Sequence, residues 1–220
     1  MLSYIKTCEN DIKWRMQEIA LIRKSTVLME ASDELRAVLR RYSVPALYAV
    51  WEGFVVFALS ECARRINQKK LSVGKVNACV VRHNVFEKFQ LKSISTQPLK
   101  QCKLLADIYK YFQGNLVLNL DVRTNSNVDF DELCKLMSHY GAAFGDDCNY
   151  KSRLDKFLNY RNRIAHGANG ISVNEELIKE FSDLIEELMD RVVNELAASL
   201  KGGKYLDKSI MSIMNESTLN

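Results

Sequence analysis

Apolar residues recur at helical spacing along the N-terminal part of the chain. The first expected helix spans residues 3–30, in which Ile5, Ile12 and Ile19 share one face. Lys and Glu residues fill many of the positions between them, as is typical of an amphipathic helix. Ser32 is a suitable cap for a second apolar run. This part of the sequence therefore predicts helices that bury one face.

A much more apolar helix is expected next. Pro45 fits its first turn, because a proline there sacrifices no helical hydrogen bond, and the pattern continues to about residue 67. Residues 44–62 are nearly long enough to span a bilayer, but Glu52 lies close to their middle and Glu61 near their end. An unpaired carboxylate at that depth is unfavourable. We therefore expect the central helix of a soluble bundle and no membrane association.

The middle of the chain, residues 71–127, is the least regular part. Helical patterns cover residues 77–90 and 99–113, which a turn-rich linker separates. Residues 115–122 alternate polar and apolar positions and predict either a short strand or an extended loop. A short helix is expected over residues 129–140. We interpret residues 71–127 as a partly irregular insertion in a helical domain.

The C-terminal part returns to clear helical patterns. Residues 150–166 predict a helix rich in Arg and Asn, and Gly167 follows at the position where a left-handed residue commonly ends a helix. Ser172-Val173-Asn174-Glu175 has the pattern of a capping box. It is expected to open a last helix over about residues 173–200, which Gly202-Gly203 ends.

These elements predict an all-α fold with two parts. Residues 1–201 form one helical domain that includes the insertion, and residues 202–220 form a tail. Within the tail, the apolar residues between Ile210 and Met214 are candidates for a small partner-binding helix.

Composition narrows the class of protein only moderately. Two prolines and nine glycines with 47% hydrophobic residues favour helices. A net charge of +4 is compatible with a polyanionic partner but does not demonstrate one. The six cysteines form no CxxC pair and no zinc-ligand spacing, and the first residues lack the pattern of a signal peptide. We expect reduced cysteines, a cytoplasmic location, and neither a metal nor a cofactor.

The residues that carry chemistry lie in the segment Arg161-Asn162-Arg163-Ile164-Ala165-His166-Gly167. On an ideal helix, Arg161 and His166 are separated by about 7.5 Å of rise and about 140° of rotation. They meet only through the long arginine side chain. Asn162 and His166 are four residues apart and share a face, so Asn162 is placed to orient the imidazole or to touch a ligand.

Arg161 and His166 together suit RNA cleavage without a metal. A histidine changes charge near neutral pH, as general acid–base catalysis requires. His166 would take the proton from a ribose 2′-OH or give one to the leaving 5′-oxygen. Arg161 would stabilise charge on the phosphorus-bound oxygens. On spacing alone, however, such a pair is more often a salt-bridging arginine and a helix-ending histidine.

Two stretches of the sequence resemble the HEPN superfamily. RNRIAHG, over residues 161–167, is similar to the R-N-x-I-A-H-G form of its signature. Tyr48-Ala49-Val50-Trp51-Glu52-Gly53-Phe54-Val55 resembles the Y-A-x-W-E-G-F-V helix of a bacterial branch related to ribonuclease toxins. The likeness covers roughly residues 35–200, except for the insertion.

The resemblance implies a dimeric helical bundle and a specific reaction. Many HEPN proteins are metal-independent endoribonucleases of toxin–antitoxin or antiviral defence systems. They leave a 2′,3′-cyclic phosphate and a 5′-hydroxyl. Arg161 and His166 match the catalytic pair of the signature, and Asn162 matches its polar position.

Four further residues have weaker claims as substrate-binding or supporting groups. Glu52 would either make a structural pair, for example one that holds Arg161 or Arg163 in place, or take a direct part in the site. Trp51 and Tyr48 would either stack on a base or belong to the core. Arg163 would contact an RNA phosphate or remain solvated.

Two other features of the sequence bear on function. His83 and His139 have no obvious partners, and we expect both to be structural or surface residues. A two-fold dimer would bring a second Arg161 and a second His166 to one site.

The sequence thus leads to a first hypothesis and two alternatives. The first is a homodimeric RNase that acts on RNA and is restrained by an antitoxin, a sensor or another defence protein. The second is a non-catalytic HEPN module for dimerisation or nucleotide sensing in a larger complex. The third is a structural helical adaptor that uses its final helix.

Overall fold

The computed structural model describes residues 2–27, 32–89, 91, 95–124, 127–145, 147–168 and 170–207. In these residues the chain is all-α, which confirms the predicted fold class. The helices are α1 (Leu2–Ser25), α2 (Asp33–Gln68), the 3-10 turn η1 (Val73–Lys75), α3 (Ala78–Lys88), α4 (Pro98–Phe112), α5 (Phe130–Ser138), α6 (Cys148–Ala165) and α7 (Glu175–Gly202).

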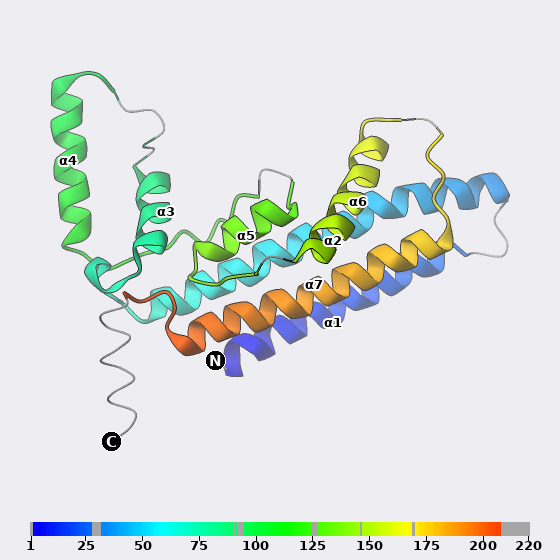
Figure 1. Cartoon of the computed structure of the whole chain (residues 1–220), viewed down its shortest axis with the longest axis horizontal. Coiled ribbons are helices and arrows are strands. Elements are labelled where there is room, and N and C mark those ends of the chain that lie inside the picture. Colours follow the sequence, from blue (N-terminus) through cyan, green and yellow to red (C-terminus); the bar gives the residue numbers. More distant parts are fainter. Residues whose placement is uncertain are drawn as a thin grey trace.

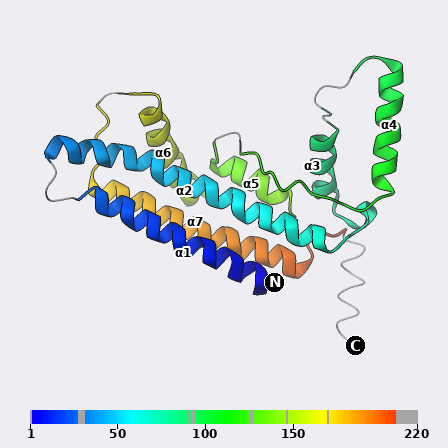
Figure 2. The same ribbon diagram turned by 180° about the vertical axis from the view of Figure 1, so that it is seen from behind.

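The core of the molecule is a bundle built around α2. This helix packs most extensively against α7 and α1, which run alongside it, and α6 crosses it (Figures 1 and 2). Leu47, Trp51 and Phe54 of α2 are completely buried, as are Phe181 and Leu188 of α7. α2 is long and apolar enough to cross a membrane by length and composition, but 56% of its apolar stretch is buried inside the protein. It is therefore the core helix of the bundle.

The expectation that a helix begins at Pro45 is wrong. α2 continues through Pro45 from Asp33 to Gln68, although a proline there cannot donate the backbone hydrogen bond that an interior residue makes. Val44 and Leu47, which flank the proline, are completely buried. Packing on both sides of Pro45 therefore keeps the helix continuous, at the expense of one backbone hydrogen bond.

The segment before α5 contains no strand in its described residues. Residues 115–124 run as an extended loop, and pairing in this region is limited to the single bridge Ser72–Asn115. Of the two alternatives for residues 115–122, the loop is therefore the one observed. The hydroxyl of Ser60 donates to the carbonyl of Leu120, and the amide of Asn67 donates to the carbonyl of Leu118. These bonds hold the loop against α2.

The last helix begins at a different cap from the one predicted. Asn174, not Ser172, is the N-cap of α7, and its side chain accepts a hydrogen bond from the amide of Leu177. Gly203 ends the helix with a φ of 63°, in the left-handed region. The tail helix expected between Ile210 and Met214 lies outside the described residues.

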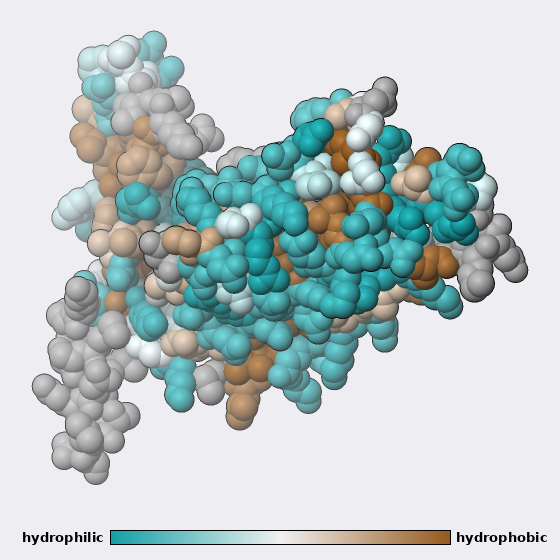
Figure 3. Space-filling view, turned by 45° about the vertical axis from the view of Figure 1, so that its right-hand side comes forward, coloured by the Kyte–Doolittle hydropathy of each residue, from teal (hydrophilic) through white to brown (hydrophobic). Residues whose placement is uncertain are grey.

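α3 and α4 project from one end of the bundle (Figure 1). Within α4 only Tyr111 is buried, and its hydroxyl accepts a hydrogen bond from the side-chain amide of Asn84 in α3. Leu99, Leu105 and Tyr109 are exposed to 86%, 66% and 70%. Apolar side chains are correspondingly visible on the surface of this projection (Figure 3).

A buried ion pair joins α1 to the middle of α2. Nε of Arg15 donates to Asp11 over 2.5 Å, and both side chains are 8% exposed. Nη1 of Arg15 also donates to the carbonyl of Val50 over 3.0 Å. Gly53 leaves the space for this guanidinium, because a Cβ there would lie 3.0 Å from Nη1. The glycine of the sequence Trp51-Glu52-Gly53 is thus explained by helix packing.

Removing either member of this pair would leave a buried charge without its partner. We expect Asp11→Ala or Arg15→Ala to lower the free energy of unfolding by about 3 kcal/mol or more, and the double variant to lose less than the sum. Lys179 and Asp183 are the matched control, with the same spacing and the same 2.5 Å separation on an exposed surface. Breaking that pair should cost under about 1 kcal/mol. Urea unfolding measures the loss of unfolding free energy for both pairs. Equal losses for the buried and the exposed pair would contradict the stabilising role of burial.

Candidate active site

α6 carries the RNRIAHG segment at its C-terminal end. Leu154, Phe157 and Ile164 are buried and fix the helix on the bundle. His166 is the C-cap residue, and its backbone N–H donates to the carbonyl of Asn162 over 3.0 Å. Gly167 follows with a φ of 75°, the left-handed conformation expected for it. The local sequence thus ends the helix directly at the candidate histidine.

Arg161 lies on the aromatic face of Tyr48, a residue of α2. The guanidinium carbon is 4.1 Å from the centroid of the tyrosine ring, which is the geometry of a cation–π interaction. Nη1 of Arg161 also donates to Oδ1 of Asn162 over 2.7 Å. The structure therefore brings together the two stretches of sequence that were singled out separately.

Tyr48 is itself held in place and belongs to the core. It is 2% exposed, and its hydroxyl accepts a hydrogen bond from the backbone N–H of Val128 over 2.9 Å. Burial raises the pKa of Tyr48 to about 12, so the ring carries no charge at neutral pH. Trp51 is completely buried and donates to the carbonyl of Val128. Neither ring therefore presents an open face on which a base could stack.

Glu52 is half-buried beside these rings. Its Oε1 accepts a hydrogen bond from the hydroxyl of Thr124, in the loop that covers α2. Its negative charge raises the pKa of Tyr48, whereas the positive charge of Arg161 lowers it. Glu52 and Arg161 therefore both lie close enough to Tyr48 to influence the pKa of its hydroxyl. Of the two roles considered for Glu52, a structural hydrogen bond is the contact observed.

His166 contrasts with Arg161 in its surroundings. Its side chain is exposed, and within the described part of the chain no hydrogen bond to the imidazole is found. Asn162 shares a face with it, but Oδ1 of Asn162 accepts its bond from Arg161. The asparagine thus orients the arginine in this structure. The imidazole is left accessible to a ligand.

A shallow hollow of about 380 Å³ lies next to this end of α6. Asn162 and the exposed Arg163 line it, and Asn159 and Asp155 extend the same face of the helix. Helical spacing of polar residues would have revealed Asp155 and Asn159, because they precede Asn162 by seven and three positions. The remaining lining residues are Asn127, Asp129 and Leu158.

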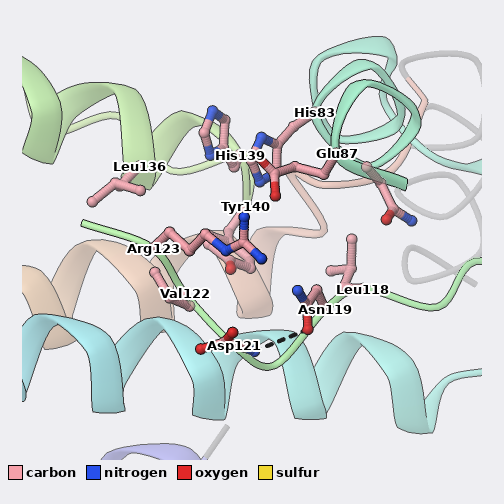
Figure 4. Close-up of a pocket in the computed structure, with 11 residues that line it drawn as sticks. His83, Glu87, Leu118, Asn119, Asp121, Val122, Arg123, Leu136, His139 and Tyr140 are labelled. Carbon is pink, nitrogen blue, oxygen red and sulfur yellow. Dashed lines mark hydrogen bonds between the residues drawn. The ribbon is translucent and has the colours of Figure 1, made fainter. Parts of the chain in front are cut away.

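A second group of titratable residues lies at the other end of the molecule. His83 of α3 and His139, which follows α5, stack with ring centroids 3.4 Å apart and an interplanar angle of 9° (Figure 4). The sequence showed no obvious partner for either histidine, and the structure shows that each is the partner of the other. Burial lowers the pKa of His139 to about 3, with further lowering by His83, Lys135 and Arg82. Burial likewise lowers the pKa of His83.

Comparison with known proteins identifies the family of the chain. The profile of the RiboL-PSP-HEPN family matches residues 10–198. The chain belongs to this family. Neither a curated protein nor a solved structure matches it. Membership of the HEPN superfamily, which the segments around Trp51 and His166 indicated, is thereby confirmed.

Because His139 is buried in the histidine stack, we expect the free energy of unfolding to depend on pH in a phosphate-free buffer. Because the pKa of folded His139 lies below the ordinary value of 6.5, the unfolded chain binds more protons between about pH 3 and 6.5. Stability should therefore rise with pH across this window, by at most about 1.4 kcal/mol per pH unit for one proton. His139→Phe keeps an aromatic ring and removes the proton. Urea unfolding at several pH values should give a shallower slope for this variant, and an unchanged slope would contradict the assignment.

Proposed function

We propose that the protein is a metal-independent endoribonuclease. The observation that carries the proposal is the arrangement at the end of α6, where Arg161 is held by Tyr48 and Asn162 while the imidazole of His166 is exposed. A fixed cation and an accessible acid–base group, both presented by the C-terminal part of α6, are the two groups that RNA cleavage without a metal requires. Membership of a HEPN family adds to this support.

In the proposed reaction the ribose 2′-oxygen attacks the adjacent phosphorus and the bond to the 5′-oxygen breaks. His166 takes the proton from the 2′-OH or gives a proton to the leaving 5′-oxygen. Arg161 donates hydrogen bonds to the non-bridging oxygens, on which negative charge accumulates. The products are a 2′,3′-cyclic phosphate and a 5′-hydroxyl. Every step uses groups of the protein and of the RNA, so the proposal invokes neither a metal nor a cofactor.

The biological setting we propose is a bacterial toxin–antitoxin or antiviral defence system in the cytoplasm. In such a setting an antitoxin, a sensor or another protein restrains the nuclease. The exposed position of His166 supports this proposal, because a partner that covered the end of α6 would block access to the imidazole. Arg163, exposed at the adjacent hollow, is in a position to contact an RNA phosphate.

An RNA-cleavage assay in the presence of EDTA tests the reaction. We expect the wild type to leave 2′,3′-cyclic phosphate ends and His166→Ala to lose activity by at least about 100-fold, as for a general acid–base group. Arg153→Ala is the matched control on the same helix, because Arg153 pairs with Glu187 of α7 and lies outside the site. Equal loss in the control, or cleavage abolished by EDTA, would contradict the proposal. Absence of cleavage by a folded, partner-free dimer would favour the non-catalytic HEPN role.

We further propose that two protomers share their sites, so that Arg161 of one chain acts with His166 of the other. Arg161→Ala and His166→Ala should then each be inactive alone. Random mixing makes about half of the dimers mixed, with one intact site in two, so about a quarter of wild-type activity should return. Native mass spectrometry would verify that mixed dimers form. No recovery in their presence would contradict sites shared in this way.

A further inference from the structure

The histidine stack borders an open cavity of about 990 Å³, far from the end of α6. The cavity lies among α3, α5 and the loop residues 117–123, as Figure 4 shows for its inner part. Most of this wall comes from residues 82–88 and 117–123, which lie outside the two segments that carry the candidate active site. The site is therefore distinct from the candidate active site.

Basic side chains outnumber acidic ones around the cavity. Arg82 and Lys88 come from α3, Arg123 comes from the loop, and Lys135 comes from α5. The acidic side chains are Glu87 of α3 and Glu132 of α5, and Asp121 lines the inner recess.

Of the four basic side chains, the two arginines are the ones without a contact in the described part of the chain. Lys88 lies over the ring of Tyr111, 5.1 Å from its centroid. Lys135 is neutralised by Glu132 at 2.9 Å. Arg82 and Arg123 are exposed, and in the described residues neither has a hydrogen bond or an ion pair. Arg123 extends toward the same space as the histidines (Figure 4). Two guanidinium groups are therefore free to bind an anion.

His139 supplies a second, independent sign of a ligand. It is only 4% exposed, and its Nδ1 has no hydrogen-bond partner in the described part of the chain. Leaving such a buried polar atom without a partner is unfavourable. Two stacked imidazoles also resist protonation, because their positive charges would lie face to face. A negatively charged ligand with acceptor oxygens would relieve both problems.

We propose that this cavity binds a phosphate monoester, whose phosphate group is held by Arg82, Arg123 and the imidazole of His139. A phosphate monoester carries close to two negative charges at neutral pH and has three acceptor oxygens. Planar guanidinium groups bind such a group through paired hydrogen bonds. The organic part lies on the apolar wall formed by Leu118 and the exposed Phe86. This inference does not rest on the proposed nuclease activity.

Histidine-ring NMR offers a direct test, because the chain contains three histidines. Inorganic phosphate, ribose 5-phosphate and AMP are titrated separately into the full-length protein at neutral pH. We expect the signals of His83 and His139 to shift with each probe, and the pKa of His139 to rise as the bound anion stabilises the imidazolium. The two esters should bind more tightly than inorganic phosphate.

The variants separate this cavity from the candidate active site. Arg82→Gln/Arg123→Gln should weaken the response of His83 and His139 by about tenfold or more. Arg23→Gln, at an exposed arginine of α1, is the matched control and should change nothing.

His166 serves as an internal reporter for the other site. Any response of His166 to phosphate should persist in the double variant and disappear in Arg161→Gln. The proposal is overturned if the signals of His83 and His139 respond to none of the three probes. It is also overturned if they respond equally in the double variant, or if inorganic phosphate binds as tightly as both esters.

Discussion

The burial of α2 is the constraint on which the rest of the structure depends. A 36-residue helix with so many apolar positions must be covered along most of its length. α1, α6 and α7 supply that cover. Because α6 lies across α2, the buried ring of Tyr48 becomes the support for Arg161. The position of the candidate site thus follows from the packing of the core.

The sequence predicted the structure correctly where the relevant pattern lies within one short segment of the chain. Periodicity predicted α6 nearly to its ends, and Gly167 was expected in the left-handed conformation that it adopts. Local signals failed where two of them competed. Pro45 suggested a helix start, but burial on both sides kept α2 continuous. Ser172 and Asn174 are both good caps, and the structure uses Asn174.

Contacts between distant parts of the sequence could not be predicted from the sequence. Thr124 bonds Glu52 across 72 residues, and Val128 bonds the hydroxyl of Tyr48 across 80. Neither contact leaves a periodic pattern, because each depends on where an irregular loop crosses α2. The stack of His83 on His139 is of the same kind. The motifs therefore contained Arg161, His166, Asn162 and Tyr48, but not the loop residues Thr124 and Val128, which bond Glu52 and Tyr48.

Arg161 and His166 differ in how far the fold prepares them. The arginine is fixed by an aromatic ring and an amide, so little conformational entropy remains to be lost when it binds a phosphate. The imidazole is exposed and has no such support in the described part of the chain. Efficient proton transfer needs a positioned group. If the protein cleaves RNA, the RNA itself or a second protomer must therefore orient His166, which makes substrate binding or assembly the step at which activity can be controlled.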